Sequence, residues 1–583
     1  MLHTLTRSLR ENKGPALVTV LLSALEVVFE IVIPLFMSNL IDFGIEGGSM
    51  AAVWKFGAFL LLLAAFQLAT GVLAARIAAR ASVGFAANLR EDMYDNVQTF
   101  AFSNIDKFST ASIVTRLTTD TTNVQNAFQM LMRMAIRAPV MLIFSMIVSF
   151  RISRDISMTF LIILPILALA LFFIIRSVFP VFTRVFRTYD ELNNVVQENV
   201  RGIRVVKSFN QERHEIGKFG AISARIYKDF SKGERLITLN APLMQFCIYT
   251  CMIVISWLGA KAIIASGNDP ALGLTTGNLT ALITYTMQIL SSLMMLSMVF
   301  AMPTISLSSA RRIAEVLEER SDIPQPEQPV MTVRDGAVDF DHVSFVYASK
   351  ADKKVLDDID LHIRSGETVG VIGGTGASKS SLVQLIPRLY DVTGGKLTLG
   401  GVDVRDYDLD TLRGAVAMVL QKNELFSGTI AENLRWGNEN ATDEQLRHAC
   451  KLACADEFIS AMPDGYDTHI EQGGTNVSGG QKQRLCIARA LLKKPKVLIL
   501  DDSTSAVDTR TDAQIQQALS TYIPDTTKII IAQRISSVQN ADRIVVLDDG
   551  RINAVGSHDE LLRSCEIYRE VYESQQKGGE DDA

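Results

Sequence analysis

A glycine-rich run follows the short apolar run Thr368 to Ile372 and precedes the helix-like segment Leu382 to Ile386. A strand, a tight turn and a helix start in this order form a phosphate cradle, because backbone N–H groups and the positive end of the helix meet the phosphate oxygens. Lys379 would reach the β- and γ-phosphates, and Ser380 would bind Mg²⁺. The candidate ATP-binding residues of the run are Gly373, Gly374, Thr375, Gly376, Ala377, Ser378, Lys379, Ser380 and Ser381.

Ser378 departs from the usual pattern of this loop, in which a glycine precedes the lysine. If the position needs a backbone geometry that glycine alone adopts easily, the serine strains the loop. A serine in an ordinary helical conformation would fit without strain. The sequence leaves both possibilities open, and we expect ATP to bind in either case.

Two further strand-like runs end in polar residues. Val497 to Leu500 leads into Asp501 and Asp502, and about thirty residues later Ile529 to Ala532 leads into Gln533. Asp502 and Gln533 are thus polar residues that directly follow strand-like runs. Their roles follow from the resemblance described below.

The composition indicates a chain in two parts. At 583 residues the chain is too long for one domain, and 48% hydrophobic residues with a mean hydropathy of +0.21 are high for a soluble protein. Six long apolar stretches lie in the first half, most of them long enough to cross about 30 Å of hydrocarbon at about 1.5 Å per residue. They are residues 16–43, 56–75, 134–150, 156–179, 236–265 and 277–303.

The distribution of basic residues predicts the orientation of these helices. Arg7, Arg10 and Lys13 precede the first stretch without a signal-peptide cleavage pattern, so this stretch is expected to stay in the membrane. The long connections 76–133 and 180–235 carry most of the Lys and Arg of this half, which places them on the cytosolic side. Both chain ends are then cytosolic.

The net charge of −6 gives no sign of a nucleic-acid partner, and the six cysteines lack metal-ligand spacing. A Pro-rich segment from Ser321 to Pro329 cannot continue a helix and is interpreted as a linker. The sequence therefore predicts a membrane domain, 1–320, with two long intracellular loops, a linker, 321–330, and a P-loop α/β domain, 331–575. The acidic tail, 576–583, is expected to be disordered.

The motifs together resemble an ABC exporter half-transporter, and the resemblance covers nearly the whole chain. Residues 89–120 and 198–215 are similar to the intracellular loops that dock on nucleotide-binding domains in that family. The resemblance implies six transmembrane helices in the ABC exporter fold, followed by an ATP-binding cassette domain of α/β class. It also implies ATP and Mg²⁺ as cofactors and a place in the plasma membrane of a bacterial cell.

Further motifs acquire roles from this resemblance. Tyr347 is similar to the aromatic residue that stacks on adenine, and Gln421 to the Q-loop glutamine that touches Mg²⁺ and senses the γ-phosphate. The implied Mg²⁺ ligands are Ser380, Gln421 and Asp501. The signature motif, which faces the partner's ATP, is represented by Ser478, Gly479, Gly480 and Gln481, followed by a helix from about Lys482. Ser505 and Asp508 resemble the D-loop.

Asp502 and Gln533 replace the family's catalytic glutamate and switch histidine. Aspartate is one methylene shorter than glutamate, which withdraws the carboxylate from the attacking water by roughly 1 Å, and a displacement of that order can cost about 10²-fold in rate. Glutamine cannot carry the charge of imidazole. Because Lys379, Ser380 and Asp501 remain, we expect ATP binding to outlast hydrolysis at this site.

The family geometry needs two such domains, so the chain must dimerise. The intact signature motif predicts a heterodimer with a second half-transporter that carries the competent glutamate and histidine, as in bacterial multidrug exporters. The alternative is a slow homodimer in which Asp502 and Gln533 suffice. An ATP-gated channel and a regulatory ATP-binding subunit are two further alternatives.

Polar and sulfur-containing residues inside the apolar stretches are candidates for a substrate cavity. Glu26 and Glu30 share one helix face and would recognise cationic substrates, unless they pair with Arg133 or Arg137. The sixth stretch is rich in methionine and includes Met294 and Met298, whose adaptable side chains suit an apolar pocket or ordinary helix packing. Drugs or lipid-like amphiphiles are the predicted substrate class, and the resemblance implies export.

Overall fold

The computed structural model describes residues 1–269, 273–347, 354–374, 376–502 and 507–580. The chain forms two compact units, Met1–Gln98 with Ser109–Glu319, and Thr99–Phe108 with Arg320–Ala583. The short helix α4 (Phe102–Lys107) therefore belongs to the second unit, although its sequence lies between helices of the first.

The first unit is helical, and its described residues contain six segments that are long and apolar enough to cross a membrane, as predicted. α3 alone has 49 residues, so at about 1.5 Å per residue it is more than twice as long as the hydrocarbon is thick. The predicted intracellular loops are therefore mainly extensions of the spanning helices. The helices are α1 (Leu2–Arg7), α2 (Lys13–Asn39), α3 (Met50–Gln98), α5 (Thr110–Thr115), α6 (Thr121–Ile152), α7 (Arg154–Arg201), α8 (Ile203–Ser208), α9 (Glu212–Thr238), α10 (Asn240–Ser266) and α11 (Thr276–Glu318).

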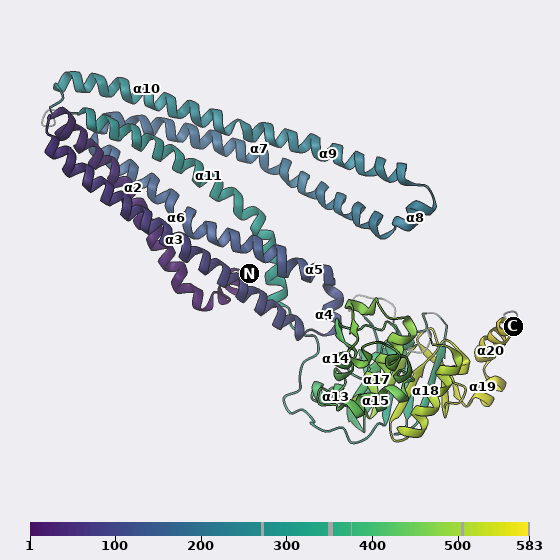
Figure 1. The fold of residues 1–583 in the computed structure, drawn as a ribbon. Helices are drawn as coiled ribbons and strands as arrows, with labels where there is room; N and C mark the ends of the chain where they lie inside the picture. Colours follow the sequence, from purple (N-terminus) through teal and green to yellow (C-terminus); the bar gives the residue numbers. More distant parts are fainter. Residues whose placement is uncertain (270–272, 348–353, 375, 503–506, 581–583) are drawn as a thin grey trace. The chain divides into compact units, whose positions relative to one another are not determined.

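Two groups of helices make up this unit (Figure 1). α2 packs against α3 and α6, and α11 packs along α6, whereas α7 runs beside α9 and α10. Tyr285 of α11 is fully buried and donates a hydrogen bond to the backbone oxygen of Ile31 on α2, at 2.6 Å. With Val27 and Met141, it forms a small apolar core that fixes α2, α6 and α11 side by side.

The second unit is an α/β domain with a six-stranded sheet in the order β12-β11-β3-β10-β9-β6 and a four-stranded antiparallel sheet in the order β2-β1-β4-β5. Its strands are β1 (Val338–Phe345), β2 (Leu356–Ile363), β3 (Thr368–Gly373), β4 (Gly394–Leu399), β5 (Val402–Asp403), β6 (Val416–Val419), β7 (Gly428–Thr429), β8 (His469–Ile470), β9 (Val497–Asp501), β10 (Thr527–Ile531), β11 (Arg543–Asp548) and β12 (Arg551–Gly556). The helices after the linker are α12 (Lys379–Gln384), α13 (Leu409–Ala415), α14 (Ile430–Arg435), α15 (Asp443–Leu452), α16 (Asp456–Ser460), α17 (Gly479–Leu492), α18 (Thr509–Tyr522), α19 (His558–Ser564) and α20 (Glu566–Glu580).

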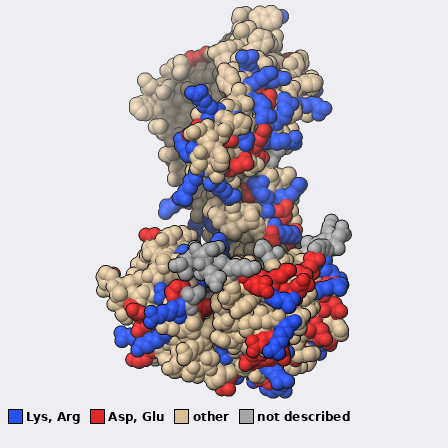
Figure 2. All heavy atoms as spheres, turned by 90° about the vertical axis from the view of Figure 1, so that its right-hand side faces the viewer, with Lys and Arg blue, Asp and Glu red and all other residues tan. Residues whose placement is uncertain are grey.

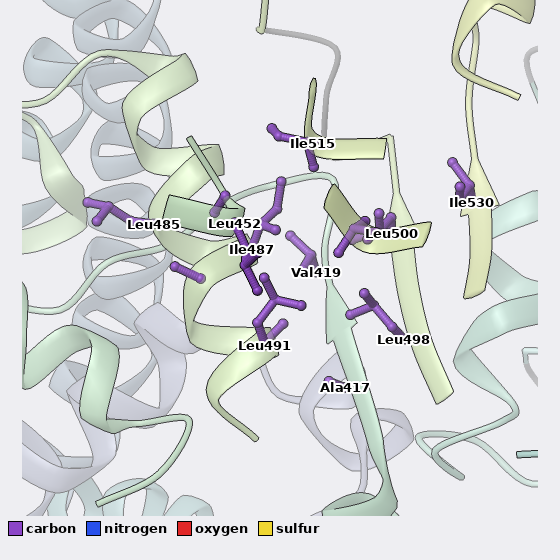
Figure 3. Close-up of a cluster of buried hydrophobic side chains, with 14 of the residues drawn as sticks. Ala417, Val419, Leu452, Leu485, Ile487, Leu491, Leu498, Leu500, Ile515 and Ile530 are labelled. Carbon is purple, nitrogen blue, oxygen red and sulfur yellow. The ribbon is translucent and has the colours of Figure 1, made fainter. Parts of the chain in front are cut away.

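The six-stranded sheet is packed against helices through a large apolar core (Figure 3). Leu498 and Leu500 of β9 meet Ile487 and Leu491 of α17 within this core. Neighbouring strands β3, β10, β9 and β6 are parallel, so their carboxyl ends lie at one edge of the sheet. This edge carries the polar residues that follow β3, β6, β9 and β10.

The tail predicted to be disordered begins at residue 576, and α20 (Glu566–Glu580) extends into it as far as Glu580. α20 is anchored because Tyr568 is fully buried and Tyr572 packs against the same core, which lets the helix continue beyond them. Residues 581–583 lie outside the described part. On the face in Figure 2, acidic and basic side chains are interspersed over the α/β unit in the lower part of the view, so no large basic patch is visible there.

Candidate functional site

The phosphate loop joins β3, which ends at Gly373, to α12, which begins at Lys379. A Cβ at Gly373 would lie 2.2 Å from the backbone oxygen of Leu547, so no other residue fits there. Gly376 has a φ of +87°, which side-chain-bearing residues rarely adopt. The loop therefore has the glycines that its tight course needs, while Thr375 lies outside the described residues.

Ser378 has φ +66° and ψ +22°, which is the left-handed conformation. Of the two possibilities that the sequence leaves open, the strained one is present. A non-glycine residue in this conformation costs about 1–2 kcal/mol. Position 378 therefore has the left-handed backbone that glycine adopts easily, although a serine occupies it.

Lys379 lies inside the loop that it is predicted to serve. Its Nζ donates hydrogen bonds to the backbone oxygens of Gly373, at 2.8 Å, and Gly374, at 2.9 Å. Burial lowers the pKa of Lys379, and the nearby charges of Asp502 and Asp501 oppose this shift. The ammonium group is thus held beside the loop carbonyls, where phosphate oxygens would be its stronger partners.

Ser380 and Asp501 lie together, since the hydroxyl of Ser380 donates to Oδ1 of Asp501 at 3.0 Å. Asp501 is only 3% exposed, and burial raises its pKa. A hydroxyl beside one buried carboxylate fits Mg²⁺, which takes hard oxygen ligands and uses phosphate oxygens and water for the rest of its shell. Among the described residues, no cluster of three or more His, Cys, Asp or Glu side chains could hold a metal ion. We call Lys379, Ser380 and Asp501 the phosphate side.

Asp502 lies next to Asp501 in sequence but has a different set of partners. Its Oδ2 accepts one hydrogen bond from Nε2 of Gln533, at 2.8 Å, and another from Nε2 of Gln421, at 3.3 Å. Its backbone adopts φ +48°, and its N–H donates to the backbone oxygen of Ile531 at 2.9 Å. We call Gln421, Asp502 and Gln533 the hydrolysis side; the ends of β6, β9 and β10 bring these three residues together.

Gln575 of α20 holds the segment that follows β10. Its Nε2 donates to the backbone oxygen of Gln533 at 2.8 Å, and its Oε1 accepts from the backbone N–H of Ile535 at 2.9 Å. The sequence gives no signal for this residue, because no periodicity or motif links two positions that lie 42 residues apart.

Tyr347 is 43% exposed, which leaves ring surface for an adenine base. Its hydroxyl forms a hydrogen bond with Oγ of Ser381 in α12, at 2.8 Å, and burial raises its pKa. The ring meets the edge of Tyr390 with centroids 5.0 Å apart. The candidate adenine residue is therefore tied to the helix that follows the phosphate loop.

Tyr390 also connects this aromatic group to α4. Its hydroxyl donates to Oδ2 of Asp106 at 2.8 Å, and its ring packs edge-on against Phe102. α4 lies within residues 89–120, which were predicted to form a docking loop. The sequence gives no signal for Tyr390, because its neighbours in space come from distant parts of the chain.

The signature residues lie at the exposed start of α17. Oγ of Ser478 accepts from the backbone N–H of Gln481, and the Gln481 side chain accepts from the backbone N–H of Ser478 at 2.9 Å. This reciprocal cap starts the helix at Gly479, three residues before the predicted start at Lys482. Gly479 and Gly480 form its first turn, and their N–H groups are free to meet an anion.

Asp508, the described member of the predicted D-loop pair, caps α18. Its carboxylate accepts hydrogen bonds from the backbone N–H and the hydroxyl of Thr511, at 2.9 and 2.8 Å, and these bonds lower its pKa. Ser505 lies outside the described residues.

In the membrane unit, Glu26 and Glu30 share a single arginine. Arg137 donates to Oε1 of Glu26 at 2.6 Å and to Oε2 of Glu30 at 2.7 Å. The pairing alternative is therefore present, with Arg137 as the partner of both carboxylates. Met294 is 42% exposed, and the side chain of Met298 lies outside the described part.

Comparison with known proteins gives matches over both units. The family model for the ABC transporter transmembrane region matches residues 16–293, and the model for the ABC transporter matches residues 356–505. The uncharacterized ABC transporter ATP-binding protein YfiB of Bacillus subtilis is 35% identical over 558 residues, 96% of each chain. Rv1273c of Mycobacterium tuberculosis, described in the same words, is 32% identical over 580 residues, 99% of this chain and 98% of that one. The solved structure of a bacterial Atm1-family ABC exporter with ATP bound matches with a TM-score of 0.82 and 24% identity, covering 97% of this chain and 99% of the other.

Proposed function

The chain belongs to the ABC transporter family, with a transmembrane region fused to an ATP-binding domain, and we propose that it is the slow-site subunit of a heterodimeric exporter. It has the fold of an ABC exporter and six helices suited to a membrane. Proteins of this family bind ATP, normally with Mg²⁺, work as dimers in the lipid bilayer and couple ATP hydrolysis to transport. The proposal concerns which ATP site does the hydrolysis.

The hydrogen bonds of Asp502 carry the proposal. A carboxylate that activates water must offer a lone pair to it, and Oδ2 of Asp502 already accepts from Gln533 and Gln421, so water would have to approach through Oδ1. The side chain is also one methylene shorter than the family's glutamate. Gln533 cannot supply the positive charge that a protonated imidazole would bring to the γ-phosphate. Both departures reduce hydrolysis at this site.

The phosphate side supports binding at the same site. Lys379 and the Ser380–Asp501 pair keep the donors and oxygen ligands that a Mg²⁺–ATP complex needs. The capped start of α17 offers an intact signature motif, Ser478 to Gln481, to the nucleotide of a second subunit. A partner with glutamate and histidine at the equivalent positions would complete a competent site against it.

We further propose export of drugs or lipid-like amphiphiles across the plasma membrane of a bacterial cell, with both termini in the cytosol. The basic residues of the long helical extensions support this orientation. Hydrolysis at the competent site would reopen the closed ATP-binding domains and move the helices joined to them.

The test restores the missing groups. The double variant Asp502→Glu with Gln533→His is purified as the full chain without a partner, beside the wild type and each single variant. We expect ATP turnover to rise about 10²-fold in the double variant while ATP affinity stays the same. A wild type that already turns over ATP at the rate of the double variant would overturn the slow-site proposal.

The same preparations test the homodimer. If Asp502 is the working base of a homodimer, Asp502→Asn abolishes the turnover of the lone chain. If the heterodimer is correct, strong activity needs co-expression with a second half-transporter that carries the competent glutamate and histidine, and Asp502→Asn in the mixed complex lowers it only slightly.

A further inference from the structure

A cavity of about 320 Å³ opens in the membrane unit where α2, α6 and α11 lie side by side (Figure 1). This volume is at the lower end of the range for small-molecule sites and suits a head group with a few carbons. The lining residues are Ser23, Glu26, Asn126, Gln129, Met130, Arg133, Met134, Arg137 and Met295.

The acidic groups at this cavity are already paired. Arg137 donates hydrogen bonds to both Glu26 and Glu30. The carboxylate of Glu26 also lies against Gly71, because a Cβ added at Gly71 would lie 3.2 Å from Oε1 of Glu26. A cationic ligand would have to compete with the guanidinium of Arg137 for these carboxylates. The pairing therefore disfavours a cation at this place.

Arg133 is the charged group that remains. It lies one helical turn before Arg137, lines the cavity and is half-buried. Within the described part of the chain it forms no ion pair or hydrogen bond, so its guanidinium offers a full set of N–H donors. A half-buried guanidinium without an anionic partner is costly unless a ligand or water satisfies it.

Two neutral polar side chains, those of Ser23 and Gln129, line the same cavity. Ser23 is 1% exposed, and its buried Oγ has no hydrogen-bond partner among the described residues. Gln129 accepts a hydrogen bond from Ser82 through Oε1, which leaves its amide N–H groups as donors. An orphan hydroxyl and an amide beside an unpaired arginine form a set of donors suited to the oxygens of an anion.

The remaining walls are apolar and adaptable. Met130, Met134 and Met295 have unbranched, polarizable side chains that accommodate alkyl chains or rings of varied shape. The cavity therefore combines a charged donor with an apolar lining, which is the complement of an amphiphile.

We propose that this cavity binds the anionic head group of an amphiphilic substrate, with Arg133 as its charged donor and Ser23 and Gln129 as neutral donors. Carboxylate, sulfonate and phosphate head groups share the required oxygens. The assignment rests on the proposed transport function, because it names the substrate class of that transporter.

The experiment compares two probes with the same alkyl chain and opposite charge, dodecyl phosphate and dodecyltrimethylammonium. Each is equilibrated with the full-length chain in nanodiscs of phosphatidylcholine, without ATP, and binding to empty nanodiscs is subtracted. We expect Arg133→Gln to weaken dodecyl phosphate binding at least about tenfold and to leave the ammonium probe unchanged. Arg133→Glu is expected to reverse the preference between the two probes.

Arg80→Gln is the matched control, because Arg80 is exposed on α3 and is not part of the cavity lining. Because the substitutions lie in the membrane unit, an unchanged helical circular dichroism spectrum and elution of the intact chain as a single species show that each variant is folded. Equal loss of both probes, or dodecyl phosphate binding that survives Arg133→Gln, would overturn the assignment. These measurements need no hydrolysis, so failure of the slow-site proposal would appear separately, in the ATP turnover of the Asp502 and Gln533 variants.

Discussion

The phosphate side and the hydrolysis side of the ATP site differ in what their side chains bind. On the phosphate side, Lys379 donates to loop carbonyls and Ser380 donates to Asp501. Phosphate oxygens could replace the carbonyls as acceptors for Lys379, and Mg²⁺ could bind the oxygens of Ser380 and Asp501. On the hydrolysis side, Asp502 accepts from the amides of Gln533 and Gln421. Under the proposed function, this difference means that one site keeps its means of binding ATP while its means of activating water are altered.

Two adjacent residues of one strand end show how the sides are separated. Asp501 is the last residue of β9 and is buried, whereas Asp502 follows with φ +48° and is half-buried. The left-handed turn directs the two carboxylates to different partners. Under the proposed roles, substitution at Asp502 would change hydrolysis without removing Asp501, the predicted Mg²⁺ ligand beside it.

Removal of the Lys379 ammonium tests the phosphate side most strongly. Lys379→Ala is expected to lower Mg²⁺–ATP affinity about a hundredfold, since two charge-assisted hydrogen bonds to phosphate oxygens are lost. Equilibrium binding of ATP to the purified chain measures this effect. Lys354→Ala removes a surface lysine that pairs with Asp357 and serves as the control. Unchanged ATP affinity in Lys379→Ala would contradict the division of the site into a phosphate side that binds ATP and a hydrolysis side.

The titration of Lys379 sharpens the same comparison. Burial lowers its pKa from the ordinary value of 10.5, so the free protein loses the ammonium at a lower pH than an exposed lysine does. Bound phosphates favour the charged form, so ATP affinity should be constant below the lowered pKa and should fall above it by up to about tenfold per pH unit. ATP binding measured from pH 7 upwards checks this, and Lys379→Arg should remove the decline because arginine stays charged.

The sequence predicts the phosphate side well because its residues follow one another within a short motif. The strand before Gly373, the helix after Ser378 and the buried Asp501 at the end of β9 all lie where the sequence indicates. The six transmembrane helices and the α/β domain were likewise predictable, from hydrophobic length and from motif spacing.

Contacts between distant segments could not be predicted from short motifs or from hydrophobic length. Arg133 and Arg137 lie one helical turn apart on α6, so the sequence alone does not distinguish them as partners of Glu26 and Glu30. The packing of α2 against α6 selects Arg137. The tie between Gln575 and the segment after β10 depends on where α20 docks. The backbone of Ser378 is set by the turn between β3 and α12, and residue type alone does not report it.

Gln575→Ala probes how firmly the hydrolysis side is held. The variant loses two hydrogen bonds to the segment 533–535, each contributing about 1 kcal/mol, so the Ile535 amide should exchange with solvent roughly five- to thirtyfold faster. ATP affinity should not change. Gln576→Ala is the adjacent control, because Gln576 bonds only to Tyr572 within the described chain. Equal exchange in the two variants would show that Gln575 does not hold this segment.

Ser378→Gly gives the smallest expected effect and tests whether the phosphate side contains strain. Glycine adopts the left-handed conformation without the steric cost that serine meets, but it also makes the unfolded chain more flexible, so a net gain of about 1 kcal/mol in unfolding free energy is expected. Lys494→Gly is the matched control, since Lys494 has φ +50° in a turn outside the phosphate loop. Both variants should gain stability, whereas ATP affinity should rise, by a fewfold at most, in Ser378→Gly alone. If both variants leave ATP affinity unchanged, the serine stores no strain that binding relieves, and the phosphate side is as competent as one built with glycine.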